Sequence, residues 1–161
     1  MPALRMMVVS LLIFGFGGGL SAGDGDNVAT IHRLYAEFVN QGNTETFDAL
    51  VADDFVEHEE LPGLPATAEG VKQFFSGFLA AFPDLQFEVE EVFGAGDRVV
   101  ARFVMRGTHK GEFMGMAPTG KTVAVKAIDI FRFADGKITD HWGLTDTMAM
   151  MQQLGAMGEP E

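Results

Sequence analysis

The first half of the chain carries apolar residues at the spacing of amphipathic helices. Asn27 can cap a first helix that runs through about Val39, and Gly42 ends it. A second, short helix starts at residue 43 or 44, and a third runs from Thr67 to the Pro83–Asp84 stop. The apolar faces comprise Val28, Ile31, Leu34, Tyr35 and Phe38, then Phe47, Leu50 and Val51, then Val71, Phe74, Phe75, Phe78, Leu79 and Phe82.

From Gln86 to Asp146 the period changes to the alternation of β-strands. Turns are predicted at residues 95–97 and at Asp135–Gly136, and a loop containing Gly and Pro spans about 110–120. These breaks divide the segment into four consecutive strands. A short strand at Phe55–His58 precedes the third helix, and a Met-rich helix follows from residue 145 to 154. No internal repeat or linker interrupts residues 23–161, so they form one domain.

This order of elements predicts an α+β domain. Helices on one face of a long, curved antiparallel sheet would leave a cone-shaped cavity between the two layers. Fifteen phenylalanines favour a large apolar interior or pocket. The outer face of the sheet would carry apolar residues suited to a homodimer contact, namely Val100, Val104, Ala124, Ile128 and Ile130.

Residues 1–22 have the pattern of a secretory signal peptide. Arg5 gives a positive start, a short apolar run follows, and small residues end at Ala22. Because the run is short and interrupted by glycines, an uncleaved membrane anchor is the second reading. We therefore predict an exported protein, periplasmic or secreted, with no stable membrane insertion after cleavage.

The charge narrows the range of partners. The formal net charge is −12, which argues against nucleic acid and against anionic membrane surfaces as binding partners.

The chain has no Cys, so disulfides, a thiolate zinc site and a Cys nucleophile are excluded. The four His residues have no metal-ligand spacing, and there is no nucleophile elbow or phosphate loop. We expect no metal and no cofactor.

The Asp135–Gly136 turn sets a register for the last two strands. Counting outward from it places Asp129 opposite Trp142, on a face shared with Phe131. A carboxyl group in such an apolar neighbourhood is a candidate general base. His141 falls on the opposite face if the last strand is regular, and a bulge would reverse this.

The hairpin before it has a less certain register. Pairing outward from residue 119 brings His109 opposite Asp129, where the imidazole could orient the carboxylate or shuttle protons. Such a pair can also be a purely structural polar contact. His58 is by itself an exposed strand residue, Asp146 either caps the last helix or supplies the acid, and Trp142 can belong to the core.

Three segments then carry a resemblance to a known family. They are FVNQGNTETFDALVADDFVEHEE, FLAAFPDLQFEVEEVFGAGDRVVARF and GTHKGEFMGMAPTGK…IDIFRFADGKITDHWGLTD. Together they resemble the SnoaL-like polyketide cyclases, often described as ester cyclases, over about residues 28–155. The resemblance implies the nuclear-transport-factor-2-like fold, an α+β barrel in which helices close a cone of curved sheet.

The resemblance also implies a reaction. Similar family members close a ring by an intramolecular aldol step without cofactor or metal. It implies Asp129 and His109 as catalytic residues, and His58, His141, Trp142 and Met114 at a site for a small apolar carbonyl compound. Either this chain is such a cyclase or isomerase, or it is an exported, non-catalytic binder of a small apolar ligand.

Overall fold

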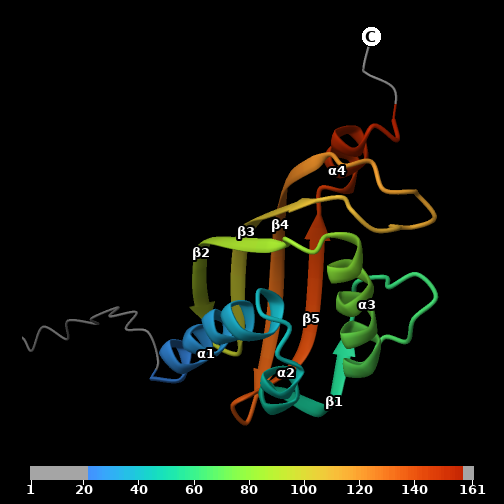
Figure 1. Ribbon diagram of the computed structural model, residues 1–161. Coiled ribbons are helices and arrows are strands. Elements are labelled where there is room, and N and C mark those ends of the chain that lie inside the picture. The colour runs from blue at the N-terminus through green and yellow to red at the C-terminus, as the bar shows by residue number, and fades with distance from the viewer. Residues whose placement is uncertain (1–21, 158–161) are drawn as a thin grey trace, which may run out of the picture.

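The structure, a computed structural model, describes residues 22–157 and confirms the predicted α+β class (Figure 1). The helical segments are α1 (Ala22–Arg33), η1 (Leu34–Val39), α2 (Thr44–Leu50), α3 (Ala68–Ala81) and α4 (Thr147–Leu154). The strands are β1 (Val51–Glu57), β2 (Gln86–Ala95), β3 (Arg98–Thr108), β4 (Thr122–Ala134) and β5 (Lys137–Thr145). Each predicted element is present, with shifts of a few residues at its ends.

The five strands form one curved, unclosed sheet in the order β1-β5-β4-β3-β2. Strands β2 to β5 are the predicted antiparallel meander. The short strand β1 joins its edge and runs parallel to β5, because the connection through α3 and the meander brings the chain back beside it. Strand β1 thus lies next to the last strand, which is 80 or more residues away in the sequence.

The core lies between the concave face of the sheet and the helices α1, η1, α2 and α3. Alternate residues of β3, from Val99 to Met105, and of β4, from Val123 to Ala127, are buried as their strand pattern predicts. Phe82, Ile31 and Leu85 are almost completely enclosed. Each such side chain contributes roughly 1.5–3 kcal/mol through burial.

Side chains cap three of the helices. Asn43 Oδ1 accepts from Thr46 N–H at the start of α2, and Thr67 Oγ1 accepts from Gly70 N–H at the start of α3. Asp146 Oδ1 accepts from Ala149 N–H at 2.9 Å and caps α4, as one of the two readings predicted. Gly155 then ends α4 in a left-handed conformation, which favours glycine.

The first predicted helix is regular only up to Arg33. Its continuation η1 is a π-helical segment, in which Asn40 N–H donates to Tyr35 C=O. Such wide turns are rare and occur frequently at functional sites, because the extra residue re-aims the side chains of one turn. The Tyr35 side chain leaves this segment towards Asp129 in β4.

A β-bulge in β5 decides which of its side chains face the core. Phe133 pairs with Ile138, but Arg132 pairs with Asp140, so Thr139 is an extra residue. The Thr139 hydroxyl donates to Arg132 C=O at 3.3 Å and holds the bulge in place. From Asp140 onward every β5 side chain lies on the face opposite to the one that a regular hairpin would give it.

Other predictions fall outside what the structure describes. The predicted signal peptide covers residues 1–22, of which only Ala22 is described. Among residues 22–157 no helix has the length and apolar character needed to cross a membrane. The predicted dimer surface keeps Ile128 exposed at the outer side, while Val104 is buried, and the homodimer itself stays a prediction.

A close backbone approach fastens the loop after β3 to the end of α3. Gly111 N–H donates to Ala81 C=O, and a Cβ on Gly111 would meet the backbone of Ala80. We expect Gly111→Ala to lower the free energy of unfolding by about 1–3 kcal/mol. Gly77→Ala is the control, because Gly77 lies in the exposed part of α3 with open space around it, so alanine should stabilise the helix there. Urea unfolding measures both, and equal stabilities would contradict the expectation.

Candidate active site

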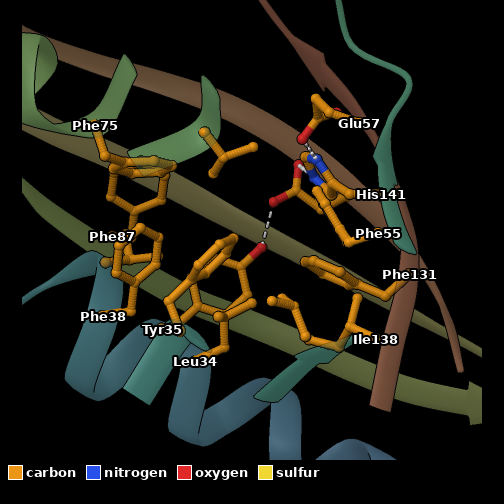
Figure 2. A pocket seen from close by; sticks show the side chains of 15 residues that line it. Leu34, Tyr35, Phe38, Phe55, Glu57, Phe75, Phe87, Phe131, Ile138 and His141 are labelled. Carbon is orange, nitrogen blue, oxygen red and sulfur yellow. Dashed lines mark hydrogen bonds and ion pairs between the residues drawn. The ribbon is translucent and has the colours of Figure 1, made fainter. Parts of the chain in front are cut away.

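An apolar cavity lies between the concave face of the sheet and the helical layer (Figure 2). Its volume is about 50 Å³. Aromatic rings dominate its walls, namely those of Phe38, Phe47, Phe55, Phe75, Phe87 and Phe131. Four polar side chains interrupt this lining: Tyr35, Glu57, Asp129 and His141. Convergent polar groups in an otherwise apolar pocket are the usual mark of a ligand or catalytic site.

Asp129 is the central member of this polar group. It comes from the middle of β4, where the strand alternation directs its side chain to the concave face, and that side chain is 13 % exposed. Tyr35 reaches it from η1 and donates its hydroxyl to Asp129 Oδ2 at 2.5 Å. In Figure 2 the dashed line that starts at the hydroxyl of the labelled Tyr35 marks this hydrogen bond. A hydrogen bond from a hydroxyl to a carboxylate at this distance is charge-assisted and strong.

His141 connects Asp129 to a second buried carboxylate. Its Nε2 lies 3.4 Å from Asp129 Oδ1, and its Nδ1 lies 2.7 Å from Glu57 Oε2. Its ring stacks on Phe131, with centroids 4.9 Å apart. The Glu57 carboxylate also accepts from the Glu59 N–H at 2.8 Å, and Glu57 is 5 % exposed. The four side chains therefore form one continuous polar chain, Glu57–His141–Asp129–Tyr35.

The two carboxylates decide the charge of His141. Burial alone would lower the pKa of its imidazole, but the negative charge of Asp129 close to Nε2, together with the hydrogen bond and the charge of Glu57, outweighs it and raises this pKa to about 10. Burial and then Asp129 also raise the pKa of Tyr35 well above its ordinary value. At neutral pH the cavity thus contains an imidazolium between two carboxylates and a protonated phenol.

The structure corrects the predicted place of Trp142. It pairs with Ile130 and not with Asp129, whose partner is Gly143, because the Thr139 bulge shifts the register by one residue. Trp142 therefore lies on the outer face, and the same shift brings His141 to the concave face. The sequence analysis named a bulge as the alternative that would turn His141 inward. The strand has this bulge, so His141 lies at the candidate site.

His58, predicted as a substrate contact, is also on the outer face. Its ring stacks flat on Trp142, with centroids 4.3 Å apart, and its Nε2 lies 2.9 Å from Asp140 Oδ1. Arg132 makes an ion pair with the same carboxylate, and Arg98 covers the Trp142 ring. Both predicted substrate contacts thus belong to an outer polar and aromatic layer, not to the cavity.

The predicted contact of His109 with Asp129 is wrong. Asp129 pairs with Ala101, whereas His109 follows the pair Thr108–Thr122 and lies eight residues beyond Ala101, roughly 25 Å along the strand. The pairs of β3 with β4 are centred on residue 115, whereas the predicted contact was counted outward from residue 119. His109 is fully buried, stacks on Phe82, and accepts from Thr119 N–H through Nδ1. Its surroundings are those of a structural core residue.

Two other predicted candidates also lie away from the cavity. Met114 is 66 % exposed at the tip of the loop and lines an open groove against α3. Asp146, the alternative candidate for the acid, is an exposed helix cap. Asp129 and His141 are thus the two predicted site residues that line the cavity.

Sequence reasoning missed Tyr35 and Glu57, although each gave a signal. Tyr35 is the one tyrosine of the chain and was assigned to the apolar face of the first helix, where its hydroxyl needs a partner. Glu57 alternates with Phe55 and therefore shares its inward face. A carboxylate on an apolar strand face indicates a site for the same reason as Asp129 does.

This arrangement is suited to proton transfer. A carboxylate base stands at the wall of an apolar cavity, a phenol can donate a proton or hydrogen bond, and an imidazolium supplies positive charge beside the carboxylate. Among the described residues, no cluster of three His, Asp or Glu side chains has the geometry to hold a metal ion.

Comparison with known proteins places this geometry in a family. The sequence model described as SnoaL-like polyketide cyclase matches residues 29–154. Aklanonic acid methyl ester cyclase AcmA of Streptomyces galilaeus is 44 % identical over 59 residues, which are 37 % of this chain and 41 % of that protein. Nogalonic acid methyl ester cyclase of Streptomyces nogalater is 28 % identical over 118 residues, covering 72 % of this chain and 88 % of that protein.

Solved structures agree with the sequence match. IdmH of Streptomyces antibioticus superimposes with a TM-score of 0.70 at 36 % identity, covering 80 % of this chain and 98 % of that chain. A SnoaL-like polyketide cyclase of Agrobacterium tumefaciens gives a TM-score of 0.65 at 26 % identity, with 80 % and 98 % covered. The chain therefore belongs to the SnoaL-like polyketide cyclase family, as its sequence motifs predicted.

Proposed function

We propose that this protein closes a ring in a small apolar keto ester by an intramolecular aldol reaction, with Asp129 as the base. The single observation that carries the proposal is the Asp129 carboxylate on the wall of a phenylalanine-lined cavity, hydrogen-bonded to Tyr35 and paired with His141. The names of the relatives, two methyl ester cyclases, favour substrates of the same class. The reaction needs only proton transfers, so the proposal includes no cofactor and no metal.

In the proposed reaction the Asp129 carboxylate removes a proton from a carbon flanked by carbonyl groups. The enolate oxygen that forms accepts a hydrogen bond from the Tyr35 hydroxyl. The high pKa of Tyr35 suits this role, because the phenol stays protonated and remains a donor. The enolate carbon then attacks a second carbonyl carbon of the same molecule, which forms the new C–C bond.

The substrate has to displace Tyr35 from Asp129. A cavity of about 50 Å³ holds little more than water, whereas pockets for drug-sized ligands measure roughly 300–1,000 Å³. The Tyr35 hydroxyl now occupies one oxygen of the base. A carbonyl oxygen that accepts from Tyr35 would release that carboxylate oxygen, so substrate binding and activation of the base are coupled in this proposal.

His141 and Glu57 act as supports for the base. His141 holds Asp129 in place from β5, and Glu57 orients the imidazolium from β1 through its contact with Nδ1. This is the arrangement of a catalytic group oriented by a second group that is itself oriented by a third. Export, predicted from residues 1–22, stays part of the proposal and does not affect the chemistry.

Asp129→Asn tests the base directly. We expect it to lower kcat by about 10²–10⁴-fold because the amide cannot accept the proton. Turnover is measured by chromatography of the aldol product, with aklanonic and nogalonic acid methyl esters as substrates. Asp146→Asn is the control and should keep full activity, because asparagine caps α4 equally well. Saturable binding of both esters without turnover in the wild type would instead favour the non-catalytic binder.

Tyr35→Phe tests the hydrogen bond to the enolate. Removing one preorganised donor should lower kcat by about 10²-fold, while the aromatic packing against Phe103 and Phe87 is kept. Steady-state kinetics on the ester that the wild type turns over measures this loss. An unchanged kcat would remove Tyr35 from the mechanism without affecting the role of Asp129.

His141→Gln tests the imidazolium through stability. The folded-state pKa of about 10 exceeds the ordinary 6.5, so the stabilisation is fully present below about pH 6.5 and is lost as pH rises towards 10. We therefore expect wild type to be more stable than the variant at pH 6, and this difference to shrink by pH 10. Urea unfolding at pH 6, 8 and 10 measures it. A difference that is constant across this range would contradict the charged state of His141.

A further inference from the structure

Glu59 occupies the space of a missing side chain on the concave face of the sheet. Gly143 is the cross-strand partner of Asp129, so a side chain at Gly143 would stand next to that of Asp129. The Glu59 carboxylate fills this place: its Oε2 lies where a Cβ on Gly143 would clash, and its Cδ lies 3.0 Å from that position. A carboxylate from the loop after β1 therefore stands beside the candidate base.

The glycine at position 143 is required by this approach and not by its backbone conformation. Gly143 is absent from the glycines with positive φ in the described chain, so an L-residue could adopt its backbone angles. Glycine in the interior of a strand weakens it and often marks a close approach of another group. The group that approaches here is the carboxylate of Glu59.

Three charged groups on three strands act on the Glu59 carboxyl through their electric fields: Glu57 on β1, Asp129 on β4 and His141 on β5. Burial raises the pKa of the Glu59 carboxyl, the positive charge of His141 lowers it, and the negative charges of Asp129 and Glu57 raise it again, with a net rise. Glu59 is half-buried, so it still reaches solvent.

We propose that Glu59 is the acid partner of Asp129, and that the two carboxyl groups share one proton during turnover. This inference rests on the proposed cyclisation. Two adjacent carboxyl groups then have opposite roles. Asp129, which is hydrogen-bonded to Tyr35, is the base, and Glu59, on the solvent side, is the acid. Environments that separate the proton affinities of two neighbouring acids assign such roles in general.

The proton balance of the reaction is then closed. Asp129 takes the proton from the carbon, and the new C–C bond converts the attacked carbonyl into an alkoxide. In this proposal Glu59 enters the step in its protonated form, gives its proton to that alkoxide and leaves an alcohol. Asp129 now carries one proton more and Glu59 one fewer, and transfer between these neighbours restores the starting state without an external acid or base.

A titration tests the shared proton without any substrate. Carboxyl carbons of ¹³C-labelled glutamate are followed by NMR against pH, and Glu59→Gln identifies the signal of Glu59. We expect the Glu59 carboxyl to titrate above the ordinary range, at lower pH in Asp129→Asn and at higher pH in His141→Gln. The proposal would be overturned if Glu59 titrated in the ordinary range of a glutamate and its titration midpoint were the same in Asp129→Asn.

Kinetics tests the catalytic part. Glu59→Gln should lower kcat by about 10²-fold and abolish the high-pH limb of the pH–rate profile, because the amide supplies no acidic proton. Glu60→Gln, a change at the exposed neighbouring glutamate, should leave the rate and the profile unchanged. Wild-type kcat and an unaltered profile in Glu59→Gln would exclude Glu59 as the acid.

Substitutions at Gly143 test whether a carboxyl group is needed at the position that the Glu59 carboxylate now occupies. Gly143→Ala should expel the Glu59 carboxylate and reduce kcat as Glu59→Gln does. In the Glu59→Ala variant, adding Gly143→Asp should raise kcat at least tenfold. The new aspartate carboxylate lies one carbon beyond Cβ, close to the present position of Glu59 Oε2. No gain in a folded double variant would count against the proposal.

The two proposals fail in different ways. If Asp129→Asn keeps full turnover, or if the wild type turns over neither ester, the proposed cyclisation fails while the NMR titration still decides whether the carboxyls share a proton. If Asp129→Asn is inactive and Glu59→Gln is fully active, only the role of Glu59 fails.

Discussion

The contact of His141 with two buried carboxylates is the interaction on which the site depends. Glu57 and Asp129 come from strands that are not neighbours, and His141 on the strand between them holds both. Two buried carboxylates without a positive charge between them would repel each other and lose their hydration. The imidazolium removes that cost and fixes the base at the wall of an apolar cavity. Every other polar group of the site is arranged around this contact.

The fold supplies the contact through two local irregularities. The Thr139 bulge turns His141 inward and Trp142 outward, and the π-helical segment η1 aims Tyr35 at Asp129. Both features depart from the regular geometry of their elements at the residues that form the site. Local departures from ideal structure are expected at functional positions, because there the requirements of chemistry compete with those of packing. The curved sheet and its phenylalanine-rich lining provide the surrounding dry space.

The glycine at position 143 extends this logic to the edge of the site. A regular strand would place a side chain there, and this chain instead admits a carboxylate from the loop after β1. Glu57 and Asp129 then contact the imidazolium directly, and its charge also acts on Glu59. Such a group of coupled carboxyls is poorly suited to packing alone and well suited to handling protons.

The sequence by itself determined the α+β class, the order of elements, the inward face of β4 with Asp129, and the family. Those features follow from local periodicity, turn chemistry and motifs, which neighbouring residues specify together. Only the tertiary structure decided the partners of Asp129. A one-residue bulge places His141, and not Trp142, on the concave face beside Asp129. The pairing of β3 with β4 differs by eight residues from the predicted one, so His109 lies far from Asp129. The parallel pairing of β1 with β5 brings Glu57 to the site. Register across strands depends on long-range contacts, and a shift of one residue reverses every side chain that follows it.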